Sequence, residues 1–147
     1  MQELKLATNC PTTNKLRYKT LWMTIGFFGL VLLGYLSLTR SPHHALKFTG
    51  GDKIEHIIAF VVITLWWGQL YTGLHKLVKI ALGFLAASIV LELLQRQIGG
   101  YPALEYGDII ASGLGVAAGL IMLQSPLGFL LLNIESLIEK TISNNGG

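Results

Sequence analysis

The chain has 147 residues, of which 52% are hydrophobic and 13% are charged, and its formal net charge is +3. Soluble domains carry about 25% charged residues, so this composition argues against a soluble globular protein and favours a membrane protein. The basic residues flank apolar segments without interleaved aromatic residues, so we expect no nucleic-acid partner. The single cysteine, Cys10, excludes an internal disulfide and provides no metal or redox motif.

The chain begins with a polar segment and continues into an apolar one. Residues 1–19 are polar and end in basic residues, which predicts a disordered N-terminal tail. Residues 20–38 contain no charge, and as a helix they would extend about 28 Å, enough to cross the hydrocarbon core. A signal peptide is the alternative, but its apolar region is usually about 7 to 15 residues and is followed by an A-x-A-like site. We therefore predict a retained first span.

Three more apolar segments predict further spans, at residues 54–71, 78–94 and 108–124. The first of these ends with Trp66, Trp67 and Tyr71, and aromatic residues are typical of the point where a helix leaves the bilayer. We expect an all-α polytopic membrane protein whose four transmembrane helices form a small bundle over residues 20–124.

The C-terminal segment, residues 125–147, predicts a different kind of helix. Ser125 and Pro126 fit an N-cap followed by a first-turn proline. Apolar residues then recur at helical spacing, but the run before Glu135 is too short to span. An amphipathic helix lying in the membrane interface is expected, followed by a short tail.

Orientation follows from the lysine and arginine residues that flank the spans. Six lie on the side of the termini and four on the other side, and a basic cluster precedes the first span. This predicts a multi-pass membrane protein with both termini in the cytoplasm.

Polar residues in three of the apolar segments would meet at one membrane surface. With four spans, the start of the second, the end of the third and the start of the fourth lie on the same side. Ionisable groups inside a membrane are costly and usually functional, so we predict an outward-facing polar pocket. Its residues are Asp52, Lys53, His56, Glu92, Gln95, Arg96, Asp108 and Ser112.

The fourth predicted span also carries a small-residue face. Gly115 and Gly119 form a G-x-x-x-G motif, which permits the close approach of another helix. A homo-oligomer that pairs through this face is one expectation.

Three spaced motifs carry a family resemblance: Asp52-Lys53-Ile-Glu-His56, Glu92-Leu-Leu-Gln95 and Asp108-Ile-Ile-Ala-Ser112-Gly-Leu-Gly115. Together they resemble the VanZ-like integral membrane family over about residues 51–123. The family has an arginine before the aspartate and an asparagine after it, where this chain has Pro102 and Ser112. Glu105 matches a position that is often acidic or small in the family. The resemblance implies a location in the bacterial inner (cytoplasmic) membrane and lowered susceptibility to a glycopeptide antibiotic, and it brings no established reaction.

Simpler interpretations compete with a pocket. Asp52 and Asp108 would each stabilise a helix N-terminus, Glu92 and Arg96 would form an ion pair along one helix, and His56 would be a buried imidazole bonded to a carboxylate. A metal site is not expected, because no tight ligand motif such as H-E-x-x-H is present, and no cofactor is expected.

Three functions therefore remain open. In the first, the pocket binds a lipid headgroup, a cell-wall precursor or an amphipathic antibiotic. In the second, His56 and a carboxylate perform acid-base chemistry on a lipid-linked substrate; the absence of a GxSxG elbow and a P-loop makes this weaker. In the third, the protein is a scaffold and the polar residues are structural.

Overall fold

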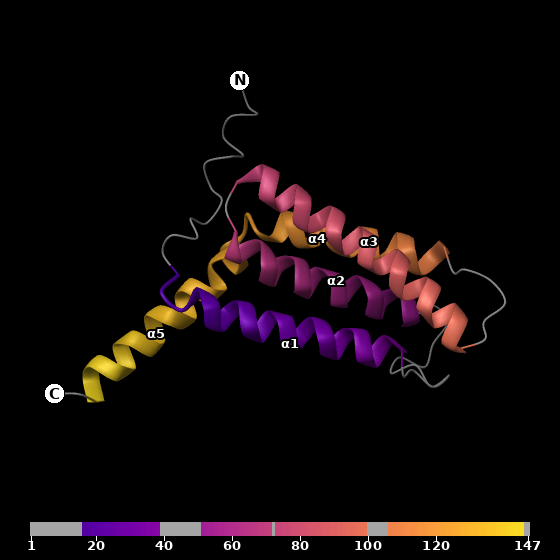
Figure 1. Ribbon diagram of the computed structural model, residues 1–147. Helices are drawn as coiled ribbons and strands as arrows, with labels where there is room; N and C mark the ends of the chain where they lie inside the picture. The colour runs from indigo at the N-terminus through magenta and orange to yellow at the C-terminus, as the bar shows by residue number, and fades with distance from the viewer. Residues whose placement is uncertain (1–15, 39–50, 72, 100–105, 146–147) are drawn as a thin grey trace, which may run out of the picture.

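The computed structural model describes residues 16–38, 51–71, 73–99 and 106–145. They form the helices α1 (Lys19–Leu38), α2 (Gly51–Leu70), α3 (Leu74–Gly99), α4 (Tyr106–Met122) and α5 (Leu130–Asn145), with a short 3-10 helix, η2 (Pro126–Phe129), before α5 (Figure 1). No strand occurs in these described ranges, so the predicted all-α class is confirmed for them.

The four predicted spans correspond to α1, α2, α3 and α4. Helix α3 is longer than its predicted span and continues through Gln95 and Arg96 to Gly99, because these residues have good helix propensity despite their polarity. Helices α1, α2 and α3 are each long and apolar enough to cross a membrane. Helix α4 is long and apolar enough only when it is taken together with the helical segment that follows it. The two are bent by 76° relative to each other. The described chain therefore has three helices able to span a membrane, or four if that bent pair forms one span.

Helices α2 and α4 run parallel and in close contact. A Cβ atom at Gly115 would lie 2.6 Å from the Ile57 carbonyl oxygen, and one at Gly119 would lie 2.7 Å from Thr64 Cβ. Only glycine permits this approach. The small-residue face of α4 therefore packs on α2 of the same chain, and a homo-oligomer through this face would require α2 to move away.

Helices α1 and α3 run in the opposite direction to α2. Trp22 near the start of α1 meets Trp66 near the end of α2 with ring centroids 5.8 Å apart, and Trp66 Nε1 donates to the Trp22 carbonyl at 3.1 Å. At the other end, Gln95 Nε2 of α3 donates to the Ser37 carbonyl of α1 at 2.8 Å. Consecutive helices thus alternate in direction.

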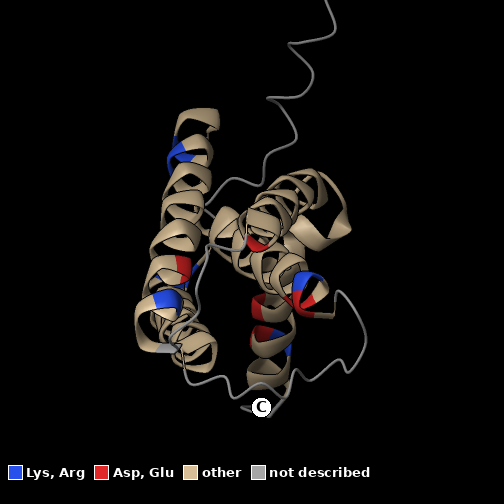
Figure 2. Cartoon of the chain, turned by 90° about the vertical axis from the view of Figure 1, so that its right-hand side faces the viewer, with Lys and Arg blue, Asp and Glu red and all other residues tan. Residues whose placement is uncertain are grey.

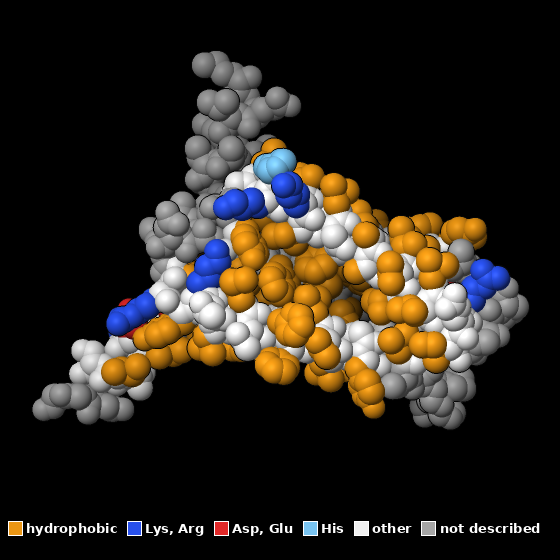
Figure 3. All heavy atoms as spheres, viewed as in Figure 1, with side chains coloured by type: hydrophobic (Ala, Val, Ile, Leu, Met, Phe, Trp, Pro, Cys, Tyr) orange, Lys and Arg blue, Asp and Glu red, His pale blue; other side chains and the backbone are white. Residues whose placement is uncertain are grey.

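Large apolar side chains cover much of the face of the bundle that Figure 3 shows. Phe27, Phe28 and Leu82 are each at least 60% exposed, whereas a soluble monomer rarely exposes wide contiguous apolar surface. Such a surface is suited to contact with lipid chains, and together with the apolar helices it indicates a membrane protein.

The cap that the sequence predicts at Ser125 and Pro126 begins the short helix η2, which leads into α5. The Ser125 side chain accepts a hydrogen bond from Leu127 N at 3.3 Å, and Pro126 occupies the first turn of η2. Residues 136–144 are all exposed, and Figure 1 shows α5 pointing away from the bundle. Its second half therefore lies at the surface, where Glu139 contacts Arg17.

The first half of α5, in contrast, is anchored in the bundle. Leu131 is fully buried, and its backbone N–H donates to Gln69 Oε1 at 3.0 Å. Glu135 is 4% exposed and accepts three hydrogen bonds of 2.8 Å, from Arg17 N, Tyr18 N and Trp22 Nε1. In the sequence, Glu135 ends the apolar run of a helix that we expect to be peripheral. In the structure it faces inward, because it lies one helical turn after the buried Leu131.

The chain just before α1 is also held in place. Residues 1–15 of the predicted tail lie outside the described residues, whereas Leu16 is buried in a cluster with Trp22, Leu70 and Leu131. At the surface, Arg17 Nη1 donates to Glu139 Oε1 at 3.2 Å, and this hydrogen bond raises the pKa of the Arg17 guanidinium.

Candidate ligand site at the polar end of the bundle

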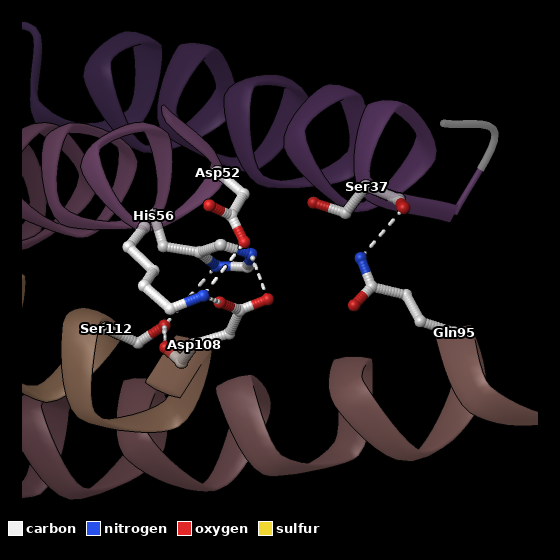
Figure 4. A network of polar contacts seen from close by, with 7 residues as sticks. Ser37, Asp52, His56, Gln95, Asp108 and Ser112 are labelled. Carbon is white, nitrogen blue, oxygen red and sulfur yellow. Dashed lines mark hydrogen bonds and ion pairs between the residues drawn. The ribbon is translucent and has the colours of Figure 1, made fainter. Parts of the chain in front are cut away.

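The parallel packing of α2 and α4 brings their first turns together. Asp52, Lys53 and His56 lie near the start of α2, and Asp108 and Ser112 near the start of α4, where their side chains point toward one another (Figure 4). Figure 2 views the molecule from this end and shows acidic and basic residues on several of its helices. We call these five residues the polar cluster.

Lys53 connects the two helices. Its Nζ atom lies 2.9 Å from Asp52 Oδ2 and 3.4 Å from Asp108 Oδ1. A Cβ atom at Gly107 would lie 2.6 Å from Lys53 Cε, so this glycine leaves room for the lysine stem to pass across. The Lys53 side chain is 43% exposed, against 20% for Asp52 and 12% for Asp108. The ammonium therefore reaches the surface, while the carboxylates lie deeper.

His56 lies between Asp108 and Ser112. Its Nε2 atom is 3.5 Å from Asp108 Oδ2, and its Nδ1 atom is 3.5 Å from Ser112 Oγ. The order serine, histidine, aspartate is that of a nucleophilic triad. However, Ser112 is only 1% exposed, and its hydroxyl donates to the Asp108 carbonyl at 2.8 Å. Ser112 is thus inaccessible to an incoming substrate, and what remains is an imidazole beside a carboxylate.

The other three predicted pocket residues lie on α3. Gln95 is used in the contact with Ser37. Arg96 is exposed in the last turn of α3, and the alternative of a Glu92–Arg96 pair stays a prediction. Glu92 is 7% exposed, and the contacts drawn in Figure 4 do not include it. Five of the eight residues are thus joined directly.

Two further residues named from the sequence, Pro102 and Glu105, lie outside the described residues. Among those described, no group of three or more His, Cys, Asp or Glu side chains is placed to hold a metal ion.

The polar cluster carries an excess of negative charge. Its two aspartates face one lysine, so its formal charge is −1 when His56 is neutral. Both aspartates lie in the first turn of their helices, where the helix dipole stabilises a carboxylate. This arrangement favours a ligand that brings a cationic group or donates hydrogen bonds.

Sequence reasoning missed a second set of buried polar residues at the opposite end. Glu135 and Gln69 are each 4% exposed, and both accept backbone N–H groups. Burial of a carboxylate requires such donors, but the donors to Glu135 come from residues more than 110 positions earlier. No local pattern reveals that pairing.

Comparison of the chain with protein-family models, with curated proteins and with solved structures finds no match.

Proposed function

We propose that this chain is a VanZ-like membrane protein of the bacterial cell envelope, and that its polar cluster binds the polar part of an amphipathic ligand. The observation that supports this is the Lys53 side chain, whose ammonium bridges Asp52 and Asp108 although the side chain is 43% exposed. A charge pair that served only to join helices would be better hidden from competing ligands. Here, the charged atoms are within reach of a molecule that approaches the end of the bundle.

The proposed ligand is a lipid headgroup, a cell-wall precursor or a glycopeptide antibiotic. A cationic amine on any of these would complement the negative excess of the polar cluster. By binding such a molecule, or by changing its exposure at the outer surface of the membrane, the protein would lower susceptibility to the antibiotic.

The proposed placement is a four-span bundle in the inner membrane with both termini in the cytoplasm. Helix α4 follows α2 from the Asp108–Lys53 contact to Gly68, where a Cβ atom would meet Leu123. Its 17 residues extend about 26 Å, so a bilayer crossed by α2 would also be crossed by α4. The basic residues near the start of α1 and of α3 then face the cytoplasm, and the polar cluster faces outward.

The proposed position of α5 is along the cytoplasmic interface. The 76° bend after α4 turns the chain away from the bundle, and Leu137, Ile138 and Ile142 expose an apolar stripe. That stripe would enter the boundary between headgroups and acyl chains.

Antibiotic susceptibility of cells that express the protein tests the proposed function. Wild-type protein should raise the inhibitory concentration of a glycopeptide antibiotic, and Asp108→Asn should return it to that of cells without the protein. Glu139→Gln, which also removes one carboxylate but at the far end, should behave as wild type at equal membrane levels. Equal protection by Asp108→Asn and Glu139→Gln would refute a role for the polar cluster.

A structural scaffold is the second candidate, favoured by the fact that the polar cluster joins α2 to α4 directly. In that case, its residues contribute only to stability, and any loss of protection should follow loss of folded protein.

A further inference from the structure

An apolar groove runs along the bundle between α1 and α3, with α2 as its floor. Its volume is about 540 Å³, and its walls include Gly34, Ile63, Trp67, Gly83, Phe84 and Ala87. A Cβ atom at Gly34 or Gly83 would meet nothing within 4 Å. These glycines therefore do not serve close helix packing, as those of α4 do, but widen the groove. Figure 3 shows this face as a hollow lined by hydrophobic side chains.

The length of the groove corresponds to one leaflet of a bilayer. Along α3 its lining extends from Ile80 to Leu91, a rise of about 16 Å. The hydrocarbon core of a bilayer is about 30 Å thick, so the groove covers about half of it. Just beyond Leu91, the hydrogen bond from Gln95 to the Ser37 carbonyl joins α3 to α1 and closes this end.

The other end of the groove is basic. Lys76 and Lys79 lie one helical turn before the lining residues Ile80 and Gly83, and so on the same face of α3. Figure 3 shows basic side chains gathered at this end of the hollow.

A third lysine reaches this end from α1. Lys19 Nζ lies 4.7 Å from the centre of the Tyr71 ring, which stacks on the lining residue Trp67. Among the ion pairs between described residues, none involves Lys19, Lys76 or Lys79. Three ammonium groups are thus available where the groove reaches the membrane surface.

We propose that this groove holds one acyl chain of an anionic phospholipid, whose phosphate is bound by Lys19, Lys76 and Lys79. The apolar walls and the one-leaflet length suit an acyl chain, and the lysines select a negative headgroup. Trp67 and Tyr71 lie at the level between them, as aromatic residues do at membrane interfaces. The site is at the opposite end of the bundle from the polar cluster, and it shares with the proposed function only the location in a membrane.

Quenching of tryptophan fluorescence by brominated lipids tests this site, because Trp67 lines the groove. The full chain is placed in phosphatidylcholine bilayers that contain rising fractions of brominated phosphatidylglycerol or brominated phosphatidylcholine. In the wild type, quenching should include a saturable component. This component should appear at a lower fraction of brominated phosphatidylglycerol than of brominated phosphatidylcholine. Identical curves for the two lipids would overturn the proposal.

Two variants with matched controls locate the effect. Lys76→Gln/Lys79→Gln should weaken the preference for the anionic lipid, by about fivefold for each lysine, whereas Arg96→Gln/Lys140→Gln removes the same charge elsewhere and should change little.

Gly83→Leu should fill the groove and remove the saturable component, whereas Ala86→Leu, on an exposed position of α3, should keep it. An unchanged preference in the lysine variant overturns the proposal even if Gly83→Leu fails to fold. Asp108→Asn should leave the lipid preference unchanged. A wrong assignment of the lipid site can therefore be told apart from a wrong proposed function.

Discussion

Lys53 Nζ lies 3.4 Å from Asp108 Oδ1, a contact that joins α2 to α4 across 55 positions of the chain. The same ammonium lies 2.9 Å from Asp52 Oδ2, so one positive charge offsets two carboxylates. The two sides of this contact are therefore unequal: loss of Asp108 leaves Lys53 paired with Asp52, whereas loss of Lys53 removes from both aspartates the ammonium that they share.

Lys53→Gln should accordingly be the more destabilising of two neutral substitutions. We expect it to lower the free energy of unfolding by about 1 to 2 kcal/mol, less than for a fully buried pair because Lys53 is partly exposed. Asp108→Asn should cost less than half as much. Denaturant unfolding in detergent measures both, and an equal loss would contradict the bridging role of Lys53.

The glycines of α4 and the glycine of the groove should respond differently to the same change. Gly115→Ala places a methyl group against the Ile57 carbonyl and Phe60 Cβ, and we expect a loss of about 1 to 3 kcal/mol from overpacking. Gly83→Ala meets no atom within 4 Å and should be neutral or slightly stabilising, since alanine favours helix. Thermal unfolding of the two variants side by side provides the measurement. Similar stabilities would mean that α2 and α4 are not in close contact at Gly115.

Sequence patterns located the helices well but the tertiary contacts only in part. Apolar runs indicate α1 to α4, because a span needs an uninterrupted apolar length, and the i, i+4 spacing of Asp108 and Ser112 correctly places them on one face. The pattern could not show that Gln95 turns to α1, since every helix has several neighbours at the same depth. It also gave no sign that Glu135 is buried, because the three N–H groups that permit its burial are remote in sequence.

Glu135 should therefore be needed for stability although it lies far from the polar cluster. Glu135→Ala leaves three donors without their acceptor, and we expect a loss of about 2 to 4 kcal/mol. Glu139→Ala, which breaks only the exposed contact with Arg17, should cost less than about 1 kcal/mol. Limited proteolysis of α5, combined with thermal unfolding, reports both effects. A stable Glu135→Ala variant would show that α5 does not depend on this carboxylate.

Cysteine labelling tests the proposed topology. In a Cys10→Ser background, Tyr106→Cys and His75→Cys place single thiols at exposed positions on opposite ends of the bundle. With both termini in the cytoplasm, a membrane-impermeant maleimide should label Tyr106→Cys but not His75→Cys in intact cells, and both after lysis. The reverse pattern would place the polar cluster in the cytoplasm.

The most direct test of a functional polar cluster is antibiotic protection per folded molecule in His56→Ala. Both contacts of His56 are 3.5 Å long, so its removal should change the free energy of unfolding by less than about 1 kcal/mol. With membrane level and thermal stability measured in the same preparation, we predict near wild-type folding and loss of protection against the glycopeptide. Protection that falls only in proportion to folded protein, or does not fall, would contradict a ligand site and leave the polar cluster as a link between α2 and α4.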